Sequence, residues 1–406
     1  MGNSRDTIKG GTRLIFDAVE GVTTTTERVH ESIAGTPKAV LSPSKSTAGG
    51  HGAIAAMVYN IIRGVNGGLR EGVDLSLSVL PPNLGTSSPS EIEAVAALNG
   101  ICGDHLETSG NALAIDMGFY TAEDTPLVLN REGIEAALPQ AGSKLAIMVH
   151  GLCMSEIGWR ASDETSIGAA LENHYGHTPL YLRYNTGRHI SKNGREFSQL
   201  LTNLIDQWPA PIDSIVLIGH SMGGLVIRSA CWYAQSTETP WLHHLEHVVC
   251  LGTPHHGSPV AKAGHAIELV VGKIPYLNAF LSGVKPSDGI KDLRHGALLD
   301  SDWSDPNGTR PRKDTRGVVP LVPGVQYSFA AAHIGRDERD PIGNLLGDLL
   351  VRKDSAAGMH KKEYRELKIA PEHCRVFSET NHFDLLHDAA VTQQVVEWLK
   401  PAEVRS

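Results

Sequence analysis

The chain has 406 residues, 41% hydrophobic and 20% charged, which supports a sizeable core and excludes global disorder. A formal net charge of −9 provides no basic field for a phosphate backbone, so we expect no nucleic-acid partner. The five cysteines are scattered and odd in number, which favours reduced thiols. The sequence shows neither a signal peptide nor about 18 consecutive apolar residues, and we therefore expect a cytoplasmic protein.

The first 110 residues are predicted to form a helical extension. Apolar residues recur at helical spacing over residues 12–33 and 53–80, and a pair of prolines ends the second run. The segment Ser90-Glu91-Ile92-Glu93 has the pattern of a capping box and predicts a third helix, ending near Gly100. Amphipathic helices of this kind usually pack against a neighbouring domain. The alternative is that they cover the entrance to a site or contact a lipid surface.

From residue 111 onward, strands alternate with helices, which predicts a mainly parallel sheet with helices on both faces. Two early strands, at residues 112–120 and 126–129, are expected to form a hairpin. The later strands are predicted at residues 144–149, 179–184, 214–218, 247–251, 325–330 and 375–378, and helices at residues 196–208, 225–234 and 391–399.

A long segment at about residues 255–323 interrupts this alternation. It begins with an apolar helical pattern at residues 260–281 and continues with polar sequence rich in Pro, Gly and Asp. Insertions of this length are usually functional. We therefore predict a cap or lid over a site, within a catalytic domain of residues 111–406.

The segment Gly219-His220-Ser221-Met222-Gly223 follows the apolar run 214–218 and precedes a predicted helix. A serine hydroxyl becomes a good nucleophile only when it is accessible, close to a base and beside donors for an oxyanion. A sharp turn between strand and helix presents the serine in this way, and glycines two residues before and after it avoid collisions. The pattern predicts Ser221 as a nucleophile; the alternative is an incidental serine in a glycine-rich turn.

The base that activates such a serine is expected on a loop after the last strand. His382 follows the predicted strand 375–378 and is the predicted base. His387 is the alternative, but it falls in what is predicted to be the closing helix. The paired histidines at 243–244 and 255–256 lack a convincing set of metal-ligand partners, so they predict no metal site.

The acid that orients the base is expected after the strand at 325–330 and before His382. Asp348 lies on a short turn before an apolar run and is the predicted acid. Asp337 and Asp340 belong to a charge cluster typical of solvated surface, and Asp354 is a third alternative.

Two backbone N–H groups are needed to bind an oxyanion. One is expected from Met222, directly after the nucleophile at the start of a helix. The other is expected from Leu152, because the predicted strand 144–149 ends in His150-Gly151 and the glycine leaves room for close approach. His150 is expected to support this loop by hydrogen bonding.

Together these motifs resemble the α/β-hydrolase superfamily and, within it, bacterial serine esterases and lipases of the triacylglycerol-lipase type. The order Ser221, Asp348, His382 is that of the superfamily. The segment 149–152 resembles the lipase oxyanion strand, and 347–356 is similar to the acid loop of bacterial triacylglycerol lipases. The segment 251–258 is similar to lipases and to proteins that deacylate glycolipid anchors. The resemblance covers about residues 110–400 and implies the α/β-hydrolase fold.

The resemblance also implies hydrolysis of carboxylic esters through an acyl-enzyme. We expect a short- to medium-chain acyl ester as substrate, and no cofactor. Secreted lipases of this type often hold calcium near the catalytic histidine; Asp384 matches the place of one ligand, but no second carboxylate is evident and no metal is predicted. The alternatives are an acyltransferase that uses the same triad, and a non-catalytic scaffold that contacts lipid through the N-terminal helices or the lid.

Overall fold

The computed structural model describes residues 89–160, 166–258, 286–303, 316–335, 351, 353–360 and 362–401. The helices predicted at 12–33 and 53–80, and the apolar part of the predicted cap at 260–281, lie outside the described residues. The sheet belongs to the larger of two compact units, which comprises Ile92–Asp104, Ile115–Val271 and Pro286–Ser406.

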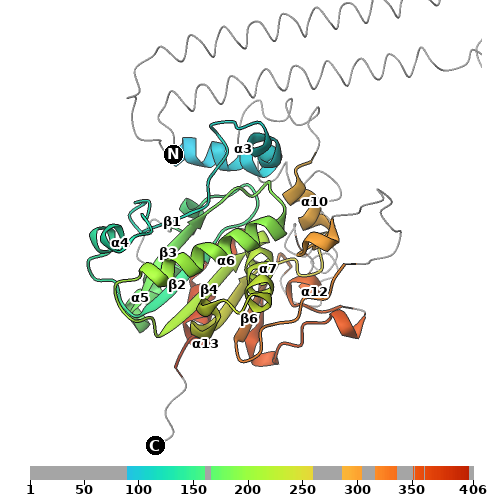
Figure 1. Cartoon of the computed structure of the whole chain (residues 1–406). Helices are drawn as coiled ribbons and strands as arrows, with labels where there is room; N and C mark the ends of the chain where they lie inside the picture. Colours follow the sequence, from blue (N-terminus) through green and yellow to red (C-terminus); the bar gives the residue numbers. More distant parts are fainter. Residues whose placement is uncertain are drawn as a thin grey trace, which may run out of the picture. The chain divides into compact units, whose positions relative to one another are not determined.

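The described residues form a mainly parallel seven-stranded sheet, as the alternation of strands and helices predicts (Figure 1). The strand order is β1-β3-β2-β4-β5-β6-β7, in which β1 pairs antiparallel with β3 and all other neighbours are parallel. The strands are β1 (Gly118–Tyr120), β2 (Lys144–Val149), β3 (His177–Arg183), β4 (Ser214–His220), β5 (Leu245–Leu251), β6 (Gln326–His333) and β7 (Cys374–Ser378).

The predicted hairpin of two early strands is wrong. β1 covers only the end of the predicted strand and pairs with β3, with Phe119 opposite Leu182. Residues 126–129 form no strand and contribute a single bridge between Pro126 and Tyr120. The side chain of Thr121 accepts hydrogen bonds from nearby N–H groups and so closes a tight turn, and a proline nitrogen cannot donate to a ladder.

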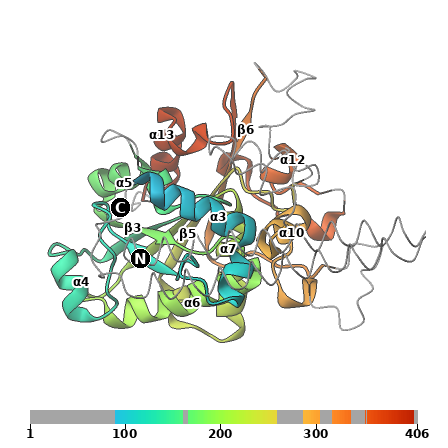
Figure 2. The same cartoon turned by 90° about the horizontal axis from the view of Figure 1, so that it is seen from above.

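Helices cover both faces of the sheet. Ala146 and Met148 of β2 point to one face and belong to the same core cluster as Leu171 of α5 (Ile167–Tyr175) and Val391 of α13 (Ala389–Trp398). The opposite face is covered by α6 (Ile190–Gln207) and α7 (Met222–Ser236). Figure 2 shows α5 and α13 on one side of the sheet and α6 and α7 on the other.

The helix predicted from Ser90 is α3 (Pro89–Thr108), which extends beyond Gly100 and has a kink at Cys102. Residues Ile92–Asp104 of α3 belong to the larger unit. Within that unit, Asn185 in the loop after β3 donates a side-chain hydrogen bond of 2.9 Å to the carbonyl oxygen of Gly103. The boundary at residue 110 between extension and catalytic domain stays a prediction.

Shorter elements complete the described part of the chain. α10 (Asp288–His295) is a helix of the predicted cap insertion; Ser287 caps its N-terminus, and Gly296 ends it in a left-handed conformation with φ 64°. None of the described helices has the length and apolar character needed to cross a membrane. The remaining elements are α4 (Arg131–Ala137), η1 (Glu156–Trp159), η2 (Pro240–His244), η4 (Asp300–Asp302), α12 (Lys353–Ala356), η5 (Glu363–Arg365), η6 (Pro371–His373) and η7 (Asp384–Leu386).

Candidate active site

Ser221 lies between β4 and α7 with φ 52° and ψ −121°, a backbone conformation that residues with a side chain rarely adopt. Its N–H donates to the carbonyl oxygen of Leu251 at the end of β5, with an N···O distance of 2.8 Å. The serine therefore sits at the carboxyl edge of the parallel strands, where open α/β sheets bind ligands.

Glycines on both sides of Ser221 permit the sharp turn. A Cβ atom on Gly223 would lie 2.1 Å from the carbonyl oxygen of Val149, and one on Gly219 would lie 2.5 Å from the nitrogen of Gly224. Both distances are shorter than any real Cβ contact, so only glycine fits without moving the backbone. The sequence spacing predicts this crowding, because the helix must begin directly above the strand.

His382 lies in the loop after β7 and is only 2% exposed. It lines the same pocket as Ser221, so the structure brings together two residues that are far apart in sequence. Ser221 is itself 8% exposed and reaches solvent through this pocket, whose volume is about 30 Å³. The other lining residues are Leu152, Met154, His220, Pro254, Ser258, Leu293, Val351 and Phe383.

His220, to which the sequence assigned no role, contacts the loop of His382. Its Nε2 lies 3.0 Å from the backbone carbonyl oxygen of His382, and the two imidazole rings are 4.8 Å apart. Burial holds the pKa of His220 well below its ordinary value, so the ring is neutral and Nε2–H is the donor. From the sequence alone, the only signal for His220 is its position next to Ser221, because its contact with His382 joins residues that are 162 positions apart.

Leu152 and Met222, the residues predicted to bind an oxyanion, both lie beside Ser221. Met222 is the first residue of α7, where backbone N–H groups have no partner within the helix. Leu152 lines the pocket, and a Cβ atom on neighbouring Gly151 would be 3.0 Å from Cβ of Ser221. The N–H of the next residue, Cys153, is already bonded to the hydroxyl of Thr186 at 3.2 Å.

His150 supports the loop after β2, as expected from its position. Its Nδ1 lies 3.0 Å from the carbonyl oxygen of Gly151, and its ring stacks on Tyr184 with centroids 4.5 Å apart. The hydroxyl of Tyr184 donates to the carbonyl oxygen of His150 at 2.8 Å. Burial lowers the pKa of His150 to about 3, so the ring is neutral and its Nδ1–H can donate to Gly151.

The predicted acid, Asp348, lies outside the described residues, as do the alternatives Asp337 and Asp340. Asp354 lies in α12. The alternative base, His387, does not lie in the closing helix, because Asp388 caps α13 and the helix begins at Ala389. Among the described residues that line the pocket with Ser221, the loop after β7 contributes His382 and Phe383.

Asp384 stabilises the loop that carries His382. Its carboxylate accepts the N–H of Asn381 at 2.9 Å, and the side chain of Asn381 in turn accepts the N–H of Phe383 at 2.8 Å. In the part of the chain that the structure describes, no group of three His, Cys, Asp or Glu side chains is arranged to hold a metal ion. The described contacts of Asp384 are those of a residue that shapes a loop.

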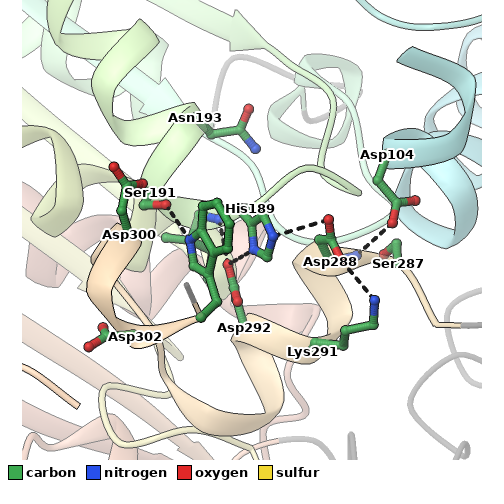
Figure 3. A network of polar contacts seen from close by, with 12 residues as sticks. Asp104, His189, Ser191, Asn193, Ser287, Asp288, Lys291, Asp292, Asp300 and Asp302 are labelled. Carbon is green, nitrogen blue, oxygen red and sulfur yellow. Dashed lines mark hydrogen bonds and ion pairs between the residues drawn. The ribbon is translucent and has the colours of Figure 1, made fainter. Parts of the chain in front are cut away.

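His189, at the start of α6, joins that helix to α10 (Figure 3). Its Nδ1 lies 2.9 Å from a carboxylate oxygen of Asp292 and its Nε2 lies 3.1 Å from one of Asp288. The same oxygen of Asp292 accepts the N–H of Ile190 at 2.9 Å, and Trp303 stacks on the imidazole ring at 3.8 Å. This network holds α10 in place, and α10 contributes Leu293 to the pocket of Ser221.

Comparisons with known proteins agree with this geometry. Residues 141–277, which include β2 to β5 and the turn at Ser221, match the sequence model of a family described as PGAP1-like alpha/beta domain. The fold is that of the α/β-hydrolases. No curated protein matches the chain.

Solved structures similar to this chain include two esterases and a lipase. A lipase from Bacillus licheniformis in its mature form is 18% identical, with 64% of this chain and 92% of that chain covered and a TM-score of 0.41. An esterase from Pyrococcus furiosus is 14% identical, with 79% and 96% covered and a TM-score of 0.39. An esterase from Pyrobaculum calidifontis is 13% identical, with 76% and 89% covered and a TM-score of 0.38.

Proposed function

We propose that the protein is a serine carboxylic ester hydrolase. The observation that carries this proposal is the backbone of Ser221, whose φ of 52° places it on a sharp strand-to-helix turn facing the same pocket as His382. A positive φ at a serine costs free energy. It persists only where the surrounding structure imposes it, and such residues cluster at functional sites. The neighbouring N–H groups of Leu152 and Met222 supply the donors that an acyl-transfer reaction requires.

In the proposed reaction, the hydroxyl oxygen of Ser221 attacks the ester carbonyl while His382 takes the hydroxyl proton. The N–H groups of Leu152 and Met222 stabilise the negative oxygen of the tetrahedral intermediate. The intermediate collapses to an acyl-enzyme, and His382 gives its proton to the departing alcohol. Water, activated by His382, then releases the carboxylic acid and restores the serine.

Asp348 is proposed to accept a hydrogen bond from His382 and to stabilise the imidazolium; this rests on sequence order alone. Replacement of each candidate, Asp348, Asp337, Asp340 and Asp354, by asparagine separates them. We expect Asp348→Asn to lower kcat by about 10⁴-fold, because the loss of the acid favours the wrong histidine tautomer. The other three variants should stay within about threefold of wild type, as expected for carboxylates that take no part in the reaction. A large loss of kcat in one of those three variants, and not in Asp348→Asn, would identify that residue as the acid.

The proposed substrate is an ester with a short to medium acyl chain. Leu152, Met154, Leu293 and Phe383 give the pocket an apolar lining that suits an acyl or alkyl group. Leu293 belongs to α10, within residues 255–323, which we propose act as a cap over the site.

Hydrolysis of p-nitrophenyl esters from acetate to palmitate tests this proposal. We expect activity on acetate and butyrate to exceed that on palmitate, and Ser221→Ala to lower kcat by at least about 10³-fold. The matched control is Ser236→Ala, which removes an exposed hydroxyl from the same helix, α7. Full activity in Ser221→Ala would refute the proposed nucleophile. No activity of wild type on any of these esters would refute the proposed substrate class.

The same residues could pass the acyl group to an alcohol instead of water, since both reactions share the acyl-enzyme. Adding methanol during turnover distinguishes the two. A hydrolase yields mainly the free acid at low methanol concentration, whereas a transferase yields mainly the methyl ester. Sedimentation of the full chain with liposomes tests the proposed lipid contact of the N-terminal region or cap; recovery in the supernatant at all lipid concentrations would exclude it.

A further inference from the structure

A second pocket, of about 310 Å³, lies beside the candidate active site. Residues 254–258 border both pockets: Pro254 and Ser258 line the pocket of Ser221, and His255 and His256 line the second one. Its volume lies at the lower end of the range for small-molecule sites, roughly 300–1,000 Å³. The second pocket is therefore large enough for a ligand of its own.

Cationic side chains dominate the polar lining of this second pocket. Arg228 comes from α7, Arg316 from the segment before β6, and Arg365 and Lys368 from the segment after α12. The lining contains one carboxylate among the described residues, that of the exposed Glu366. Because most of the described charged side chains in this lining are cationic, the pocket favours an anionic ligand.

Arg228 is 5% exposed, and no carboxylate among the described residues neutralises its charge. Its Nη2 donates to the carbonyl oxygen of Val319 at 2.7 Å, and its Nη1 lies 3.4 Å from Nδ1 of His255. No carboxylate within the described ranges forms an ion pair with it, and burial lowers the pKa of its guanidinium. The Nε atom of Arg228 has no hydrogen-bond partner among the described residues.

His255 supplies a second buried donor. It is 3% exposed and stacks on Phe329 with ring centroids 4.2 Å apart. Because the guanidinium of Arg228 can only donate, Nδ1 of His255 is the acceptor and Nε2 carries the hydrogen. Burial holds the pKa of His255 well below its ordinary value, in agreement with a neutral ring. Nε2 likewise lacks a partner in the described part of the chain.

We propose that this pocket binds a small organic phosphate. The guanidinium groups of Arg228, Arg316 and Arg365 are planar forks that suit phosphate oxygens, and a dianion balances the positive lining better than a single carboxylate does. Leu298 and Val319 add apolar surface for the organic part of the ligand. The proposed site is separate from the ester hydrolase proposed above and does not depend on it.

Isothermal titration of the full chain with phenyl phosphate, at constant ionic strength in chloride buffer, tests this proposal. We expect saturable 1:1 binding with a Kd below about 1 mM, and at least about tenfold weaker binding of benzoate, which carries one charge. Arg228→Gln should weaken phenyl phosphate binding by about tenfold or more, and Lys368→Ala, at the exposed rim, by about threefold. The control Arg131→Gln removes an exposed arginine outside the pocket and should leave Kd unchanged.

Circular dichroism shows whether Arg228→Gln is folded. If it is unfolded, the weaker phenyl phosphate binding expected of Lys368→Ala tests the proposal instead. Repeating the titration on Ser221→Ala makes the result independent of any esterase activity. Inorganic phosphate and vesicles with phosphatidic acid distinguish a soluble phosphate from a lipid headgroup, because only the lipid would retain the protein on sedimented vesicles. Absence of saturable heat up to about 10 mM phenyl phosphate, equal binding of benzoate, or equal weakening in Arg131→Gln would overturn the proposal.

Discussion

Ser221 occupies a backbone region that costs about 1–3 kcal/mol for a residue with a side chain. Two rigid elements impose this cost. β4 is buried along its whole length, and α7 begins at the next residue, so the turn has no freedom to relax. The hydrogen bond from its N–H to Leu251 fixes the serine further. In physical terms, the fold holds one side chain in place before any substrate arrives.

His220 is expected to be a positioning residue for His382. Its Nε2–H holds the carbonyl oxygen of His382, so His220→Phe should lower kcat by about fivefold or more, the value of one hydrogen bond, with KM little changed. His220→Gln can place an amide N–H near the same oxygen and should recover most of the activity. Steady-state kinetics on p-nitrophenyl butyrate measure both. Equal losses of kcat in the two variants would mean that His220 acts through packing and not through its hydrogen bond.

At single positions, the sequence predicts local geometry where the elements that form it are consecutive in the chain. Ser221 and its flanking glycines could be predicted, because the strand, the turn and the helix follow one another in sequence. The nearness of His382 to Ser221 could be predicted only by assuming the fold. The roles of His220 and Leu293 could not be predicted, because their contacts join segments that are distant in sequence.

The helix α10 is held by hydrogen bonds that reach it from the start of α6. Asp292, which is 3% exposed, accepts hydrogen bonds from both His189 and Ile190 (Figure 3). Burial raises the pKa of its carboxyl group, while the hydrogen bond from His189 acts in the opposite direction. A buried carboxylate of this kind is retained only when its partners are in place. The position of Leu293 in the pocket of Ser221 therefore depends on this contact.

Asp292→Ala should destabilise the protein by about 3 kcal/mol or more, because it leaves Nδ1 of His189 and the N–H of Ile190 without their acceptor. Asp300→Ala is the control: its ion pair with Arg195 is at the surface, with side chains 39% and 52% exposed, and should contribute less than about 1 kcal/mol. Urea-induced unfolding measures both changes. Similar losses in the two variants would mean that the buried network contributes no more than a surface pair.

Strands and helices could be predicted where the buried residues are apolar and recur at the spacing of the element. β2 is apolar and buried from Leu145 to Val149 because both of its faces are covered, and its predicted bounds match those observed. The early hairpin failed because a turn closed by Thr121 and a proline at 126 override an apolar run. Residues 196–208 were predicted as a helix, whereas α6 begins at Ile190, because buried polar residues at its start hide the apolar pattern.

Buried or half-buried neutral histidines are spread through the larger unit. Burial lowers the pKa of His150 to about 3 and that of His247 to about 4, and it holds the pKa values of His220 and His255 well below the ordinary range. Each of these rings must gain a proton when the chain unfolds below pH 6.5. The stability of the whole fold is thereby linked to pH.

We expect the free energy of unfolding to fall as the pH falls from 6.5 towards 4, because in this range the unfolded chain binds more protons than the folded one. A fully buried histidine such as His150 contributes up to about 1.4 kcal/mol per pH unit. Above pH 6.5 these histidines do not make the free energy of unfolding depend on pH. His247→Gln should flatten the dependence, and the exposed His243→Gln should not. Unfolding curves at pH 7 and pH 5 that coincide would refute this link.

Covalent labelling tests most directly whether Ser221 is an activated nucleophile. A fluorophosphonate reacts only with a serine that is activated by a base and faces an oxyanion site. We expect intact-mass spectrometry to show one adduct per chain, peptide mapping to place it on Ser221, and His382→Ala to abolish it. Adduct formation on another serine, or a chain that stays unlabelled under conditions in which a known serine esterase reacts, would show that Ser221 is not an activated nucleophile.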